Sequence, residues 1–254
     1  MHQTITRTFL SLLAIVSTTV VFAAQNDTLR RKDANGWDFI QVSSYNVVRA
    51  EGYVHNGIRE GVWNEFHATG FPSAVTTYIH GEKDGMAMTI TGAGVVSEVA
   101  HYKNNKLEGP FRVYNTEPGM GLLEESYYSE GKKHGGYTKW YKNGNKQESG
   151  VYTSDVREGK SLWYFESGAL AAEYNYRNGE IDGDVTTYYP NSKPSAYGKY
   201  EKGVQTGLWK EFHENGNIKA EGKYVNGVKE GEWKNYDENG KFTKNSKYVK
   251  GELK

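Results

Sequence analysis

The chain has 254 residues, of which 37% are apolar and 14% aromatic, with 20 tyrosines, 30 glycines and no cysteine. Its 31 basic and 31 acidic residues lack the basic excess of a nucleic-acid-binding protein, and the absence of cysteine excludes disulfides, thiolate metal sites and thiol nucleophiles. Frequent turns and amphipathic rings predict a structure without a deep aliphatic core.

The first 23 residues have the pattern of a signal peptide. Arg7 precedes an apolar run over residues 9–22, and the small residue Ala23 follows. This run is shorter than the roughly 20 residues that a membrane-spanning helix needs, so we expect cleavage after Ala23; the alternative is an uncleaved anchor helix. The pattern therefore predicts export, to the periplasm, the outer envelope or the medium.

Residues 24–35 are polar and show no apolar period. Such a segment cannot bury enough apolar surface to offset the entropy of ordering it. We therefore expect a disordered linker between the signal peptide and a repeat domain over residues 36–254.

From residue 36 onward the sequence repeats about every 24 residues. The glycines that we take as the origin of each unit are Gly61, Gly85, Gly109, Gly135, Gly159, Gly183, Gly207 and Gly231, with Gly36 one period earlier. Tyrosines keep the same interval, at positions 53, 78, 102, 128, 152, 176, 200, 224 and 248. A fixed period of this size predicts stacked copies of one small unit, with function on an extended surface.

Each unit contains two turn signals, such as Asn215-Gly216 and Asn226-Gly227. Asn-Gly between apolar stretches is the strongest short signal for a β-hairpin. We therefore predict an all-β fold, an elongated single-layer antiparallel meander of about eight hairpin repeats that is twisted or curled. The third unit carries Pro118-Gly119 and two extra residues, which predicts a longer loop around Glu117 to Gly121.

Aromatic residues recur in two columns, two and five positions after the origin glycine. The members taken as candidate binding residues are Trp63, Trp209 and Trp233 in the first column, and Phe66, Phe212 and Tyr236 in the second. The two columns have opposite parity, so either both faces of the sheet carry rings or a bulge places them on one face. The rings either hold the sheet together or form an exposed platform for a protein strand, a glycan or a lipid headgroup.

The segment from Gly207 to Gly227, GLWKEFHENGNIKAEGKYVNG, resembles the MORN-variant repeat of bacterial YwqK-like proteins. The likeness extends over residues 36–254 and is looser in the second and third units, where Ala87 and Phe111 replace tryptophan. The resemblance implies a sheet of hairpins, membership of a toxin-antitoxin antitoxin family, and a scaffold that binds proteins or membranes without chemistry of its own.

No residue pattern indicates catalysis. None of the histidines forms a metal-ligand pair, and we interpret those that share a position, His67 and His213, as surface variation. Carboxylates recur just before the origin glycines and are interpreted as solvated turn residues rather than a catalytic pair; they are Glu60, Glu108, Glu158, Asp182 and Glu230. We expect no enzymatic activity, no cofactor and no metal site.

The leading prediction is an exported, non-catalytic scaffold that binds a protein partner. One alternative is an antitoxin or immunity-type protein that neutralises a toxin. Another is a binder of glycan or of a membrane surface through the aromatic column. Nucleic acid is not expected as a partner.

Overall fold

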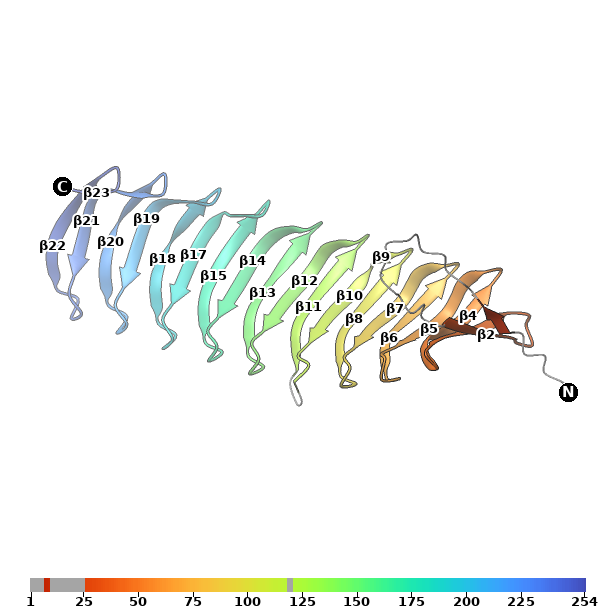
Figure 1. The fold of residues 1–254 in the computed structure, drawn as a ribbon. Coiled ribbons are helices and arrows are strands. Elements are labelled where there is room, and N and C mark those ends of the chain that lie inside the picture. The colour runs from red at the N-terminus through yellow and green to blue at the C-terminus, as the bar shows by residue number, and fades with distance from the viewer. Residues whose placement is uncertain (1–6, 10–25, 118–120) are drawn as a thin grey trace, which may run out of the picture. The chain divides into compact units, whose positions relative to one another are not determined.

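The computed structural model describes residues 7–9, 26–117 and 121–254 (Figure 1). All regular structure in these ranges is β-strand, and each strand is antiparallel to those it pairs with. The prediction of an all-β antiparallel meander of hairpin repeats is therefore confirmed. No helix in these ranges is long and apolar enough to cross a membrane. The predicted signal peptide lies outside the described residues except for 7–9, and the predicted loop at 117–121 is described only at its ends.

The chain divides into an N-terminal unit, Met1–Pro118, and a C-terminal unit, Gly119–Lys254. The strands of the N-terminal unit are β1 (Arg7–Phe9), β2 (Asn26–Lys32), β3 (Asp38–Ser44), β4 (Val47–His55), β5 (Ile58–Phe66), β6 (Pro72–Ile79), β7 (Glu82–Ile90), β8 (Val96–Lys103), β9 (Lys106–Leu107) and β10 (Gly109–Tyr114). From β1 to β9 each strand pairs with the next, and β8 also pairs with β10.

The C-terminal unit continues the same hairpin pattern. Its strands are β11 (Leu122–Ser129), β12 (Lys132–Trp140), β13 (Lys146–Thr153), β14 (Val156–Tyr164), β15 (Leu170–Arg177), β16 (Glu180–Ile181), β17 (Gly183–Tyr188), β18 (Pro194–Glu201), β19 (Val204–Phe212), β20 (Ile218–Val225), β21 (Val228–Tyr236), β22 (Phe242–Val249) and β23 (Glu252–Leu253). Each strand pairs with its sequence neighbour, except that β17 pairs with β15 and β18, because β16 is a two-residue piece.

Two kinds of turn close the hairpins. At the tight turns both central residues have positive φ, as at Asn226 (50°) and Gly227 (81°), which matches the right-handed twist of the flanking strands. At the wider turns one residue alone has positive φ, as Gly144 does (85°). Asn143 contributes through its side chain instead: its Oδ1 accepts a hydrogen bond from the Asn145 N–H, and its Nδ2 donates to the Glu166 carbonyl of the next repeat. In this Asn-Gly dipeptide the glycine therefore adopts the positive φ of the turn, and the asparagine side chain bonds to the next repeat.

Each origin glycine forms a bulge. Gly231 has φ of 74°, and the register between β20 and β21 shifts between the pairs Glu221↔Lys234 and Lys223↔Glu230. Beyond the bulge, pairing with β22 is regular from Trp233 to the residue before Tyr236. A further register shift lies between Asn235 and Tyr236, but the extra residue there is Thr243 of β22, so β21 itself keeps its alternation from Trp233 to Tyr236. Of the two alternatives, the sheet therefore carries rings on both faces. We call the side of Trp209 and Trp233 the tryptophan face, and the other side the opposite face.

The expectation of a disordered linker is wrong for Asn26–Lys32, which forms β2. This strand pairs with β3 along its whole length, from Asn26↔Ser44 to Lys32↔Asp38. Its turn has the backbone bonds of the wider repeat turns, from Asp33 N–H to the Trp37 carbonyl and from Gly36 N–H to the Asp33 carbonyl. Gly36 is therefore a turn glycine and not an origin glycine. The neighbouring strand supplies the hydrogen bonds that order this polar segment, which composition alone does not reveal.

Tyr53 does not belong to the tyrosine column that its spacing indicated. Val54 pairs with Arg59 and Tyr78 pairs with Lys83, and both partners lie two residues before an origin glycine. Val54 therefore takes the column position and is 5% exposed, whereas Tyr53 points to the other face and is 37% exposed. The cause is one residue of register, because neighbouring side chains on a strand point to opposite faces.

Candidate functional site

The tryptophans of the predicted binding column are buried. Trp63, Trp209 and Trp233 are 5%, 6% and 1% exposed, so the prediction of an exposed indole platform is wrong. Each indole lies over a glycine of the preceding strand: a Cβ at Gly52, Gly198 or Gly222 would lie within 3.0 Å of the ring. These rings are the core of the sheet.

The periodic tyrosines complete this core on the tryptophan face. Trp209 makes edge contacts with Tyr200 and Tyr224 at centroid distances of 5.5 and 5.4 Å, and Trp233 contacts Tyr224 and Tyr248 at 5.3 and 6.3 Å. Each tyrosine belongs to a strand beside the tryptophan's own. The interpretation that the rings stabilise the sheet by packing on adjacent strands is confirmed.

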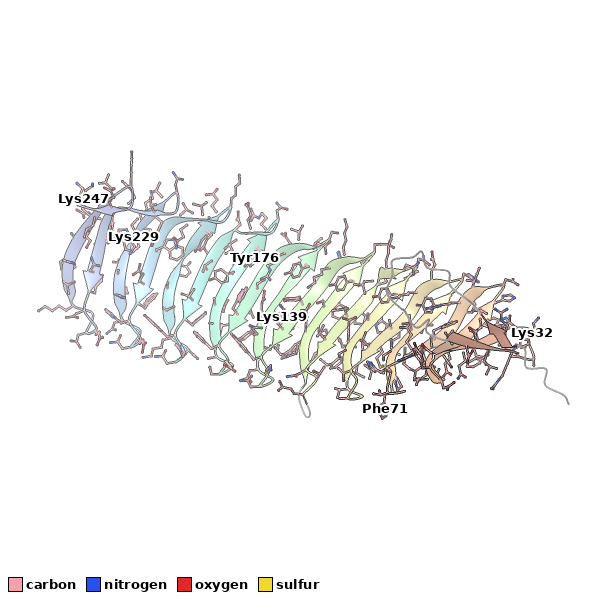
Figure 2. The ribbon with its side chains drawn as sticks, in the orientation of Figure 1. Lys32, Phe71, Lys139, Tyr176, Lys229 and Lys247 are labelled. Atoms are coloured by element: carbon pink, nitrogen blue, oxygen red, sulfur yellow. The ribbon has the colours of Figure 1, made fainter. Side chains whose placement is uncertain are left out.

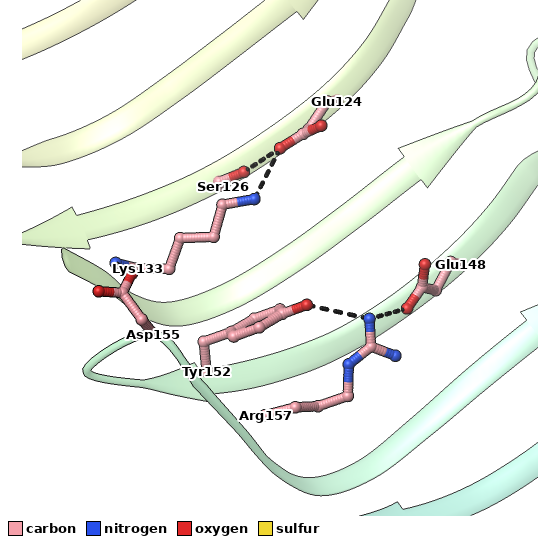
Figure 3. A network of polar contacts seen from close by, with 7 residues as sticks. All are labelled: Glu124, Ser126, Lys133, Glu148, Tyr152, Asp155 and Arg157. Atoms are coloured by element: carbon pink, nitrogen blue, oxygen red, sulfur yellow. Dashed lines mark hydrogen bonds and ion pairs between the residues drawn. The ribbon is translucent and has the colours of Figure 1, made fainter. Parts of the chain in front are cut away.

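Three repeats of the C-terminal unit carry another residue in place of the tryptophan, and a polar network accompanies two of these replacements (Figure 3). Tyr137, Ser161 and Val185 occupy the tryptophan position, and the polar network belongs to the repeats of the first two. Two residues before Ser126 and Gly150 stand the carboxylates Glu124 and Glu148. The equivalent position near the C-terminus, two residues before Gly222, holds the buried Ala220. Charged and hydroxyl groups thus fill the space of the missing indoles.

Every carboxylate in this network has a polar partner. Glu124 Oε1 accepts hydrogen bonds from Ser126 Oγ at 2.7 Å and from Lys133 Nζ at 3.1 Å. Glu148 is 5% exposed and forms an ion pair with Arg157, which also donates to the Tyr152 hydroxyl at 2.9 Å. A buried ion pair held in this way specifies side-chain positions, and its carboxylates are engaged rather than poised for proton transfer.

The pKa shifts agree with a structural role. Burial opposes ionisation of Glu124, but the Ser126 and Lys133 hydrogen bonds outweigh it and lower its pKa. Burial raises the pKa of Tyr137, and the charges of Glu148 and Glu124 raise it further, so its hydroxyl stays protonated. None of these shifts brings a pKa closer to neutral pH, where a general acid or base works best.

The Glu124 carboxylate should make stability depend on pH. Its folded pKa lies below the ordinary value of 4.5, so its contribution is complete above pH 4.5 and is lost as the pH falls through the folded value. We expect Glu124→Gln to cost roughly 1–2 kcal/mol near pH 7 and to leave a smaller loss of stability on acidification. Urea unfolding at a series of pH values measures both quantities. Parallel pH profiles for the wild type and the variant would contradict this role.

The carboxylates before the origin glycines are turn caps, not solvated surface groups. Glu60 accepts a hydrogen bond from the backbone N–H of His80, Glu158 from Asn178, and Glu230 from Lys250. Each donor is the first residue of the next tight turn and has positive φ, between 51° and 52°. The His80 backbone bond is the main cause that lowers the pKa of Glu60. The acids therefore connect one hairpin to the next.

The interpretation of His67 and His213 as surface variation is also wrong. Nε2 of His67 lies 2.9 Å from the Ile90 carbonyl, and Nε2 of His213 lies 3.0 Å from the Tyr236 carbonyl, one repeat further along. At the same position in other repeats the hydroxyls of Tyr141 and Tyr189 donate to the equivalent carbonyls. The signal that could have revealed this link is the recurrence of a hydrogen-bond donor six residues after the origin glycine.

The accessible part of the predicted column lies on the opposite face of the C-terminal unit. Phe212 and Tyr236 are half-buried there, as Phe66 is in the N-terminal unit. Leu208 is 77% exposed and lines a hollow of about 270 Å³. The charged residues that line the same hollow are Lys210, Glu221, Glu232 and Lys234. We call these five residues, with the exposed Tyr197 beside them, the Leu208 surface.

Strand register orders the charges of the Leu208 surface. Tyr197 pairs with Lys210, Lys210 with Glu221, and Glu221 with Lys234, so basic and acidic side chains alternate across β18–β21. Glu221 is fixed from two sides, by the Tyr236 hydroxyl at 3.0 Å and by Lys210 Nζ at 3.7 Å. The hydrogen bond to Glu221 raises the pKa of Tyr236. Figure 2 shows the side chains along the strands of the ribbon.

Comparison with known families identifies the repeat type. The MORN repeat variant matches residues 157–178, 205–226 and 229–243. The C-terminal half carries MORN repeat variants. The second and third matched segments contain all seven residues that line the hollow at Leu208, including Trp209 and Gly222. No curated protein matches the chain.

Proposed function

We propose that this chain is an exported, non-catalytic binding module whose MORN repeats present the Leu208 surface to a protein partner. The observation that carries the proposal is the 77% exposure of Leu208 within a hollow edged by charged residues. An apolar centre with a polar rim is the arrangement of protein–protein interfaces. Burying one such side chain contributes about 1.5–3 kcal/mol to association, and the surrounding charges select the partner and its orientation.

The fold does not account for this surface. The core of these repeats lies on the tryptophan face, where Trp209, Ala220 and Trp233 form one buried cluster. Leu208 is excluded from that cluster by the alternation of the strand, so its apolar side chain adds nothing to the core. Contact with a protein partner therefore explains a leucine at this exposed position better than a role in folding does.

The N-terminal sequence supports export. Arg7 and the apolar run over 9–22 have the order of a signal peptide, and the partner would then be sought on the exported side of the membrane. A delivered toxin is one protein that would fit, as the resemblance to YwqK-like antitoxins implies.

Site-specific crosslinking tests the proposal. The protein is produced with its own N-terminus, cells are fractionated, and a photo-crosslinking amino acid is placed at Leu208 or, as a control, at Val228, which is 40% exposed in a tight turn. We expect one partner protein to crosslink from position 208 but not from 228, in an exported fraction. Binding of that purified partner should weaken at least about tenfold with Leu208→Asp, because the charge is unpaired in an apolar contact.

Equal crosslinking from both positions would show that the contact is unspecific. Binding that Leu208→Asp leaves unchanged would exclude the Leu208 surface as the interface. Since Leu208 is exposed, the variant should keep the wild-type melting temperature, which separates loss of binding from loss of folding.

A further inference from the structure

A cluster of aromatic rings lies at the first hairpins of the N-terminal unit, on the side away from the buried Trp63. Trp37 stacks on His55 at a centroid distance of 5.6 Å and an interplanar angle of 15°, and it meets Tyr53 at 6.4 Å. Phe39 meets Tyr53 edge-on at 5.4 Å. Tyr53 reaches this cluster only because it is one residue out of register with the tyrosine column.

The rings border a cavity of about 300 Å³ with a polar side. Its lining consists of Asp33, Asn35, Trp37 and Tyr53. One oxygen of Asp33, Oδ1, accepts the backbone N–H groups of Asn35 and Trp37 and so holds the turn in place. Within the described part of the chain, the Asn35 amide and the Trp37 indole N–H make no side-chain hydrogen bond. The lining of this space therefore includes a carboxylate, an amide and an indole N–H beside aromatic rings, which together can accept and donate hydrogen bonds.

The turn itself does not require these aromatic residues. Asp237 forms the same pair of bonds in the last wide turn, to the N–H groups of Asn239 and Lys241. The residue in the place of Trp37 is there a lysine. Trp37 is therefore an addition to a turn that forms without it, and its half-buried apolar ring stands where a polar side chain would serve.

We propose that this cavity is a binding site for a neutral saccharide. A pyranose ring presents a flat apolar face of C–H groups and an equatorial rim of hydroxyls, so it needs an aromatic surface beside hydrogen-bonding groups. Trp37 and Tyr53 supply the first, and Asp33 and Asn35 supply the second, as acceptor and donor. The volume lies at the lower end of the range for small-molecule sites, which suits one or two sugar rings.

The charges around the cavity favour a neutral ligand over an anionic one. Asp33 is the charged side chain in the lining, and its carboxylate would repel an anionic sugar or a phosphate headgroup. Arg31 pairs in register with Phe39 and lies outside the lining. A lipid surface would favour basic residues in the lining, whereas the charged side chain that lines this cavity is an acid, and Arg31 lies beside the ring cluster across from Phe39.

Titration calorimetry with neutral oligosaccharides tests the site. The probes are cello-, chito-, malto- and xylo-oligosaccharides, with galacturonate oligomers and anionic lipid vesicles for comparison. We expect saturable binding of at least one neutral probe, weakened about tenfold or more by Trp37→Ala and partly retained by Trp37→Phe. The matched control is Lys241→Ala, at the equivalent position of the Asp237 turn, which should leave binding unchanged.

Asn35→Ala provides a second variant that removes a donor without touching the rings. It should also weaken binding while the far-ultraviolet circular dichroism stays that of the wild type. No saturable binding of any neutral probe would overturn the proposal, as would binding only to vesicles or undiminished binding by Trp37→Ala. These outcomes are independent of the Leu208 surface, because the crosslinking experiment does not involve the N-terminal hairpins.

Discussion

Replacing Trp233 with alanine is expected to lower the free energy of unfolding by about 3–5 kcal/mol, the range measured when large aromatic residues are truncated in protein cores. Trp233 is 1% exposed, packs against Tyr224 and Tyr248, and carries Lys229 Nζ at 3.8 Å from the ring centroid. Its removal leaves a cavity above Gly222, which has no side chain to fill it. Denaturant unfolding followed by circular dichroism measures the loss.

The control for this prediction is Leu208→Ala, which removes a side chain that is 77% exposed and should change stability by no more than about 0.5 kcal/mol. Because repeat proteins can unfold in parts, amide hydrogen exchange should also locate the effect of Trp233→Ala in β20–β22. Similar losses for the two variants would show that the tryptophan face is not the core.

Gly198→Ala is expected to destabilise the protein by about 1–3 kcal/mol, the usual cost of forcing extra atoms into a packed interior. The backbone at Gly198 does not have positive φ, so the cost comes from collision alone: the added Cβ would lie within 3.0 Å of the Trp209 ring. Thermal and denaturant unfolding give its size. Gly136→Ala is the matched control, because a Cβ there meets nothing within 4 Å, and it should be neutral or slightly stabilising.

A double-mutant cycle makes this prediction specific. In a Trp209→Ala background the ring is gone, so Gly198→Ala should then cost little. An equal cost in both backgrounds would mean that the glycine acts through its backbone and not through the space that it leaves for the indole.

Local chemistry in the sequence was sufficient to predict the strands and turns. Asn226-Gly227 can adopt the two positive φ angles of a tight turn, and its recurrence about every 24 residues predicts stacked hairpins without any knowledge of tertiary contacts. The opposite parity of Trp233 and Tyr236 likewise required rings on both faces unless a bulge lay between them.

The location of the candidate sites could not be predicted in this way. Whether Trp233 is buried depends on the side chain across from it, and the decisive neighbour is Gly222, which the register of β20 and β21 places beneath the ring. Tyr53 changed faces through one residue of register, and β2 was ordered by hydrogen bonds from β3 that no local pattern encodes.

The sequence by itself thus determined the repeat, the hairpins and the all-β class, because turn residues and strand alternation act over a few neighbouring positions. Only the tertiary structure decided which aromatic rings are core and which surfaces are open. That decision rests on pairing between strands, because the register sets which glycine lies beneath each indole and on which face Tyr53 meets the Trp37 cluster.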